Sequence, residues 1–139
     1  MFLVRLIYVS EVDDGFTKTD IEQILTSARR LNTKLSVTGL LCFSNRYFLQ
    51  CLEGGRSEVN QIYRNICQDA RHKQVTLLDY KEAVAREFDT WSMGYMPESS
   101  LTFEMNLRYS GNSEFSPYQM SGESCHQMML ELSKTVPVI

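Results

Sequence analysis

The chain has 139 residues, of which 43% are hydrophobic and 22% charged, and its formal net charge is −3. This size predicts one domain, and the composition is that of an ordinary soluble globular protein. The slightly acidic balance excludes the basic surface with which proteins bind nucleic acid or anionic membranes. The longest apolar run is too short to span a bilayer, and the four cysteines show no CxxC or zinc-like spacing. We therefore expect a reduced, cytoplasmic protein.

The first third of the chain predicts a strand followed by a helix. Residues 2–10, FLVRLIYVS, are rich in β-forming residues and apolar at both parities, as in a central strand, with Tyr8 on the face of the even-numbered residues. In the segment that follows, Thr19 and Glu22 form a capping-box pattern, and apolar residues then recur at helical spacing. This pattern predicts a helix that begins at Thr19 and ends near Asn32, which would act as its C-terminal cap.

The stretch 36–55 predicts two strands joined by a tight turn at residues 44–46. Because side chains alternate along a strand, Gln50 should share a face with Phe48 and Leu52. A primary amide between two large apolar neighbours must find hydrogen-bond partners, or its burial costs about 2–7 kcal/mol. The groups that form hydrogen bonds with Gln50 are therefore the first candidates for a functional site.

Beyond the turn, the sequence predicts a second helix and two further strands. Ser57 can cap the helix, and residues 75–84, VTLLDYKEAV, have the composition of a strand. Residues 90–96, TWSMGYM, predict a short last strand with Trp91 and Met93 on one face. The resulting order β-α-β-β-α-β-β is a ferredoxin-like plan with one added strand.

The last forty residues are more polar and predict two short helices, near residues 101–109 and 123–134. Both helices of the ferredoxin-like unit cover the same face of the sheet, so the other face needs cover. We therefore expect an α+β fold in which a ferredoxin-like sandwich, residues 1–97, carries a C-terminal two-helix extension, residues 98–139, on the opposite sheet face. The apolar residues expected to form that cover are Leu101, Met105, Met128, Met129 and Leu132.

The ferredoxin-like plan places Tyr8 and Gln50 on the adjacent central strands, pointing toward the helices, where Asn32 would join them. A polar cluster in a mostly apolar slot is typical of a cofactor site, although a hydrogen-bonded core cluster fits the pattern equally well. Other chemistries find less support. With two histidines, a histidine metal cluster is excluded, and the Walker lysine and the serine hydrolase elbow are missing. An acylphosphatase-like enzyme would need an arginine in the loop at residues 11–16, which is acidic here.

Several motifs, taken together and in this order, resemble the BLUF domain, a flavin-binding blue-light sensor. The resemblance covers residues 2–96, and its tail is similar to that of the short phototaxis sensors of cyanobacteria. The motifs are RLIYVS around Tyr8, SARRLN ending at Asn32, VTGLLCF, FLQCLEG around Gln50, QDARH ending at His72, and WSM at residues 91–93.

The resemblance implies FAD as a noncovalent cofactor, with its isoalloxazine ring between the two helices. Gln50 would bridge Tyr8 to the N5/O4 edge of the ring, and Asn32 would hold the O4/N3 side. Light would drive electron and proton transfer from Tyr8, after which the rearranged Gln50 amide would donate a hydrogen bond to O4 and shift the absorption to the red. Trp91 and Met93 would lie on the switch strand beside Gln50. Further residues implied to hold the cofactor are Ile24, Ile66, Asp69, Arg71 and His72.

On this resemblance the protein is a photoreceptor and not an enzyme, and it would act through a downstream signalling protein. The resemblance to the phototaxis sensors implies a response-regulator-like partner and a ring-shaped homo-oligomer such as a decamer. The alternative is a flavin-free ferredoxin-like protein-interaction module, which would purify without colour. We expect no contact with nucleic acid or membranes and no metal.

Overall fold

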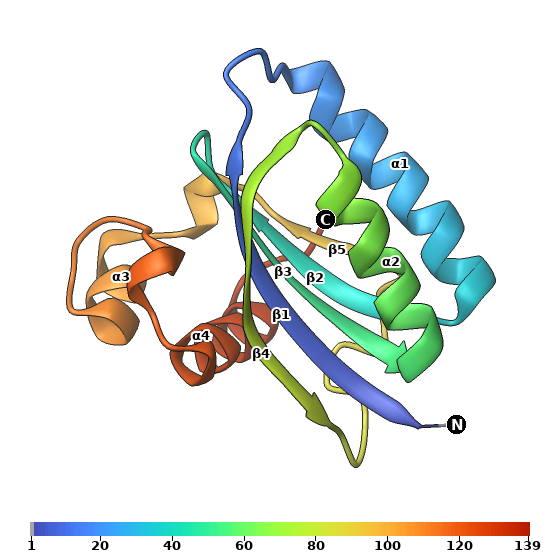
Figure 1. Ribbon diagram of the computed structural model, residues 1–139. Helices are drawn as coiled ribbons and strands as arrows, with labels where there is room; N and C mark the ends of the chain where they lie inside the picture. Colours follow the sequence, from blue (N-terminus) through green and yellow to red (C-terminus); the bar gives the residue numbers. More distant parts are fainter. Residues whose placement is uncertain (1) are drawn as a thin grey trace.

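The computed structural model describes residues 2–139 as a five-stranded sheet with helices on both faces (Figure 1). The strand order is β4-β1-β3-β2-β5, and every neighbouring pair is antiparallel except β2 and β5. The strands are β1 (Leu3–Val12), β2 (Thr38–Phe43), β3 (Tyr47–Gly55), β4 (His72–Glu82) and β5 (Gly94–Met96). The helices are α1 (Lys18–Leu35), α2 (Arg56–Gln68), α3 (Phe103–Ser110) and α4 (Gly122–Thr135), with two short 3-10 turns at Glu98–Ser100 and Pro117–Gln119. The expected ferredoxin-like fold is confirmed.

Both helix starts in the ferredoxin-like unit differ from the prediction. α1 is capped by Thr17, whose side chain accepts from the backbone of Asp20 in a capping box, so the prediction of Thr19 was wrong. Two overlapping Thr-x-x-acid patterns are present, and the choice between them depends on the extended backbone of the cap residue, which the local sequence does not fix. α2 begins directly after Gly55, so Ser57 lies inside the helix and does not cap it.

The end of α1 also differs, because the helix continues one turn beyond Asn32. It ends at Ser36, whose φ of 57° is left-handed and whose backbone N–H bonds to the carbonyl groups of the last turn. Asn32 is therefore a helical residue, and it is 1% exposed. Its side chain points into the protein, whereas the side chain of a C-terminal cap would be exposed to solvent.

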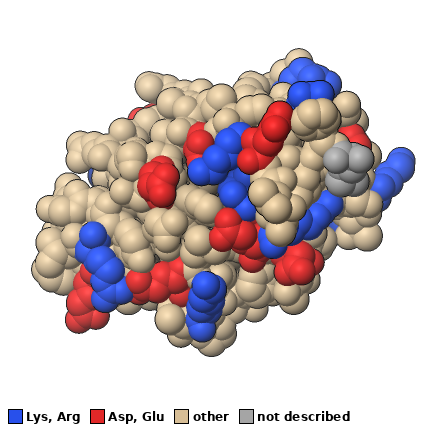
Figure 2. Space-filling view, turned by 90° about the horizontal axis from the view of Figure 1, so that it is seen from below, with Lys and Arg blue, Asp and Glu red and all other residues tan. Residues whose placement is uncertain are grey.

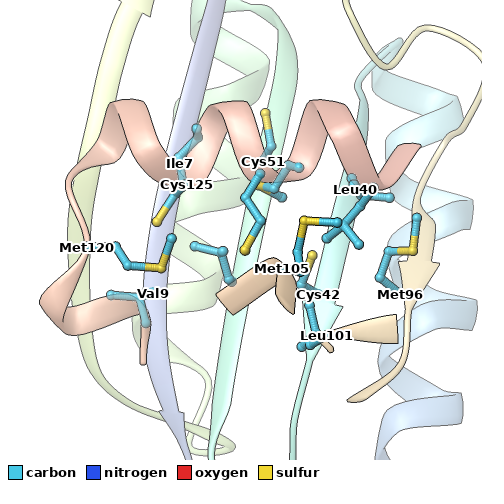
Figure 3. Packing of buried hydrophobic residues seen from close by; sticks show 14 of the residues in the cluster. Ile7, Val9, Leu40, Cys42, Cys51, Met96, Leu101, Met105, Met120 and Cys125 are labelled. Atoms are coloured by element: carbon cyan, nitrogen blue, oxygen red, sulfur yellow. The ribbon is translucent and has the colours of Figure 1, made fainter. Parts of the chain in front are cut away.

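Helices α3 and α4 cover the sheet face opposite α1 and α2, as predicted (Figure 1). The predicted cover residues Leu101, Met105, Met128, Met129 and Leu132 are all buried in this layer. The packing between the sheet and α4 is rich in sulfur, as Figure 3 shows for three cysteines and three methionines. Methionine side chains are flexible and fill irregular gaps, so this interface tolerates repacking better than an interface of branched side chains.

The last strand is shorter than predicted, and the prediction that Trp91 and Met93 share a face was wrong. Only Gly94–Met96 is a strand, and it is preceded by a turn at residues 89–90 and a bend at residues 92–93. Met93 is buried with the residues under α1 and α2, whereas Trp91 packs against the cluster under α4. The alternation of side chains along a strand does not hold through a bend, which is why the pattern failed here.

Charged groups of both signs are interspersed on the face shown in Figure 2, with no large area of one sign. This distribution agrees with the small net charge of the chain. Within residues 2–139, no helix combines the length and apolar character needed to cross a membrane.

Candidate functional site

A pocket opens between α1 and α2, with the central strands as its floor. Its cavity volume is about 140 Å³, and the whole empty space, including the part open to solvent, is about 650 Å³. All eight residues predicted to hold a cofactor line it, namely Tyr8, Ile24, Asn32, Gln50, Ile66, Asp69, Arg71 and His72. The other lining residues are Ser27, Ala28, Leu31, Leu41, Phe48, Ile62 and Asn65. The fold thus brings together side chains from both helices, from strands β1 to β4 and from the segment between α2 and β4.

The floor of the pocket carries a short chain of hydrogen bonds. Tyr8 and Gln50 lie directly opposite each other on β1 and β3, which is why their side chains meet. The Tyr8 hydroxyl donates to Gln50 Oε1, and Gln50 Nε2 donates to Met93 Sδ at 3.3 Å. All three residues are at least 95% buried, at exposures of 1%, 5% and 2%. Met93, and not Trp91, is therefore the neighbour of Gln50 in this structure.

Tyr8 is held in its neutral form by its surroundings. Burial raises the pKa of its phenol well above the usual 10, and the negative charge of Asp69 adds to this effect. A neutral phenol that donates to an amide oxygen still has its proton available for transfer along that hydrogen bond. The raised pKa of Tyr8 means that the phenol does not ionise near neutral pH.

Asn32 connects the pocket to the segment that precedes β5. Its Nδ2 donates to the carbonyl oxygen of Ser92 at 2.7 Å, from a position in the last turns of α1. The same segment is held again at the next residue, since the carbonyl oxygen of Met93 accepts from Arg29 at 3.0 Å. α1 therefore holds the two carbonyl groups that flank the Met93 Cα atom.

The segment after α2 places Asp69, Arg71 and His72 at one end of the pocket. Arg71 donates to both carboxylate oxygens of Asp69, at 3.0 and 2.7 Å, so the two charges are paired. Burial of Asp69 works against ionisation, but the hydrogen bonds and charge of Arg71 outweigh it and keep the pKa of the carboxyl below its usual value. His72 Nδ1 is 2.7 Å from Ser10 Oγ, and its ring lies 4.4 Å from that of Phe48.

Sequence reasoning missed two polar residues that line the pocket, Ser27 and Asn65, and also Ser10, which lies 2.7 Å from the lining residue His72. Ser10 lies two residues after Tyr8 on β1, so the alternation of the strand placed it on the correct face. Ser27 and Asn65 lie on helix faces that the apolar pattern does not mark. The alternation of side chains along β1 was enough to predict which way Ser10 points. No sequence pattern marked Ser27 and Asn65 on the two helices.

The protonation of His72 should make stability depend on pH. Burial lowers the pKa of His72 to about 4, opposed by Asp69 and reinforced by Arg71, whereas the unfolded value is near 6.5. Between these values the unfolded chain binds the extra proton, so stability falls as the pH falls through this window. We expect the free energy of unfolding to drop by at most about 2 kcal/mol from pH ~7 to pH ~5 because of this residue.

Urea denaturation of the wild-type protein and of His72→Gln at both pH values measures this contribution. The variant keeps every other titrating group, so its stability should change less with pH than that of the wild type. Equal pH dependence in the two proteins would assign the acid sensitivity to other groups.

Residues 3–94 match the family model described as BLUF, sensors of blue-light using FAD. Among curated relatives, the chain is 42% identical over 86 residues to the blue light- and temperature-regulated antirepressor BluF of Escherichia coli (strain K12). It is 32% identical over 100 residues to the photoactivated adenylate cyclase subunit beta of Euglena gracilis. These matches cover 62% and 71% of this chain, but only 21% and 12% of the two relatives.

Solved structures of similar size have the same fold over nearly the whole chain. The ground state of BlsA matches with a TM-score of 0.89 at 27% identity, covering 99% of this chain and 91% of that one. The dark state of BlrB, a BLUF protein, matches with a TM-score of 0.81 at 28% identity, covering 95% of both chains. The similarity therefore includes α3 and α4, which lie outside the matched family model.

Proposed function

The chain belongs to the BLUF family of blue-light sensors that use flavin, and from this premise we propose that it is a photoreceptor that binds FAD noncovalently between α1 and α2. In this proposal residues 1–97 form the light-sensing domain, and residues 98–139 form an extension that passes the signal on. The observation that carries the proposal is the buried hydrogen-bonded chain from Tyr8 through Gln50 to Met93 in the floor of the pocket.

The side chains of the pocket suit a flavin in their chemistry. An isoalloxazine ring has two broad apolar faces and a polar edge, and the pocket offers apolar side chains from both helices, including Ile24 and Ile66. Amides from Asn32 and Gln50 line the same space and are suited to the polar edge. We assign the polar end with Asp69, Arg71 and His72 to the pyrimidine and ribityl side of the cofactor.

The proposed switch depends on what the residues of the floor do. When bound, the flavin supplies blue absorption and, once excited, a strong electron acceptor. Tyr8 gives up an electron, and its hydroxyl proton then leaves along the hydrogen bond to Gln50 Oε1; both return afterwards. Gln50 is left rotated or tautomerised, so that its N–H group no longer donates to Met93 Sδ and can donate a hydrogen bond toward the ring. No covalent bond is made, so the change reverses in the dark.

We propose that the signal leaves through a partner protein and that the chain itself has no enzymatic activity. The E. coli relative is by name an antirepressor, which supports action on another protein. By family resemblance we propose a response-regulator-like partner and a ring-shaped homo-oligomer such as a decamer. The four free thiols support a reducing, cytoplasmic location. The sulfur-rich contact between the sheet and α4 supports repacking of the extension as part of the output.

The visible spectrum of the purified protein, recorded dark and then under blue light, tests the proposal. We expect a yellow protein with a small, reversible red shift. Tyr8→Phe should keep the colour and lose the shift, because the electron and proton of the phenol are gone. A colourless protein that takes up no FAD would favour the flavin-free interaction module, and a full shift in Tyr8→Phe would refute the role of the phenol.

A further inference from the structure

Arg29, on the partly buried side of α1, joins two segments that are far apart in the sequence. Its Nε donates to the carbonyl oxygen of Met93 at 3.0 Å, and its Nη2 donates to the carbonyl oxygen of Ile139 at 2.9 Å. Both bonds are charge-assisted, which makes them stronger than bonds between neutral groups. One guanidinium therefore holds the backbone next to Gln50 and the backbone of residue 139 at a fixed separation.

The segment 136–139 lies along the outer edge of β5, and the chain terminus is seen beside β5 in Figure 1. Tyr95 and Ile139 exchange both main-chain hydrogen bonds, at 3.0 and 3.2 Å, as an antiparallel strand pair does. The packing is also tight, because a Cβ atom on Gly94 would lie 2.6 Å from Cγ1 of Val138. The segment thus extends the sheet by a short, close-fitting addition at β5.

From these contacts we propose that Arg29 is a positioning residue of the photoswitch, which makes the docking of residues 136–139 on β5 depend on the backbone position of Met93. This inference rests on the proposed function. In the dark arrangement Gln50 Nε2 donates to Met93 Sδ, and Arg29 holds the Met93 backbone so that the sulfur stays in place. When the Gln50 amide turns away, Met93 Sδ loses its polar partner, and the backbone here is then held by Arg29 at the Met93 carbonyl and by Asn32 at the Ser92 carbonyl.

A shift of the Met93 backbone has two routes to the 136–139 segment. One runs through the shared guanidinium, which cannot follow the Met93 carbonyl without lengthening its bond to the Ile139 carbonyl. The other runs along β5, because Tyr95 is two residues from Met93 and pairs directly with Ile139. Both routes weaken the contacts of residues 136–139 with β5. Light should therefore reduce the fraction of molecules in which this segment is paired with β5. The released element is an extended apolar edge, a form that a partner protein can pair with.

Hydrogen exchange and dark recovery of the full-length, flavin-loaded protein test the proposal, with Arg29→Ala compared with Arg30→Ala. Arg30 is the matched control because it is the next residue of the same helix, carries the same charge and is exposed. Arg29→Ala should reduce the protection of residues 94–96 and 136–139 in the dark, and Arg30→Ala should not. In the wild type, blue light should reduce protection at the same residues.

Arg29→Ala should still shift to the red, because Tyr8 and Gln50 are intact, but its dark recovery should be slower by about tenfold or more, the change expected for loss of one charge-assisted hydrogen bond. Recovery as fast as in the wild type would overturn the positioning role. Unchanged protection of 136–139 in dark Arg29→Ala, or in the illuminated wild type despite a red shift, would overturn the coupling. If the wild type shows no red shift, the proposed function fails, while the dark comparison still decides whether Arg29 holds the segment.

Discussion

Replacing Gln50 with Leu should abolish the red shift completely while leaving the flavin bound. In the wild type, both polar atoms of this amide are engaged, Oε1 by the Tyr8 hydroxyl and Nε2 by Met93 Sδ. Leucine has a similar volume and neither a donor nor an acceptor, so no hydrogen bond is left to rearrange. The apolar walls of the pocket are unchanged, which is why binding should persist.

The same substitution should also lower stability, because the buried Tyr8 hydroxyl loses its acceptor, at a cost of about 1–3 kcal/mol. Difference spectra in the dark and under blue light measure the first effect, and urea unfolding measures the second. Gln61→Leu is the matched control, since it makes the same change at an exposed position of α2. A red shift of normal size in Gln50→Leu would remove the amide from the switch.

The Tyr8–Gln50 contact could be predicted because it depends on two simple regularities. Side chains alternate along a strand, and the ferredoxin-like order makes the first and third strands neighbours, so two even-numbered residues on them face the same layer. The register that sets them directly opposite each other was not predicted, and the structure shows it from Leu3 with Gly55 to Glu11 with Tyr47.

The position of Met93 could not be predicted by the same reasoning. Its contact with Gln50 depends on the bend at residues 92–93, whose carbonyl groups accept from Asn32 and Arg29 of α1, about sixty residues earlier in the chain. A long-range contact between a side chain and a backbone carbonyl leaves no periodic pattern in the sequence. This explains why Trp91 and Met93 could not be told apart before the structure was known.

No pattern in the sequence indicated that charged side chains would be buried on the sheet face opposite the pocket. Arg5 and Glu53 are odd-numbered residues on neighbouring strands, and they lie 6% and 0% exposed beneath the extension. Arg5 Nε donates to Glu53 at 2.9 Å. The Glu53 carboxylate also accepts from the backbone N–H groups of Glu87 and Phe88, at 3.0 and 2.7 Å. Three donor groups therefore compensate for the burial of one carboxylate.

This carboxylate anchors the loop that leads from β4 to Met93. Phe88 is fully buried in the cluster under α4, and its backbone N–H group donates to the Glu53 carboxylate. The loop is therefore attached to β3. From the other face, α1 holds the same connection through Asn32 and Arg29. The segment that carries the switch residue is thus attached at both ends to rigid elements, which limits its movement to the few residues between these anchors.

Glu53→Ala should therefore be the most destabilising substitution considered, lowering the free energy of unfolding by about 3 kcal/mol, because it leaves the buried Arg5 with the half-exposed Glu87, at 2.8 Å, as its remaining ion-pair partner. It also removes the acceptor of two backbone N–H groups and leaves a cavity against β3. Glu82→Ala is the matched control, since Glu82 is exposed on β4, and its effect should stay within about 0.5 kcal/mol. Urea unfolding of both variants measures the difference. Nearly equal midpoints would mean that solvent or another side chain takes over the role of Glu53, and that the β4–β5 loop does not depend on it.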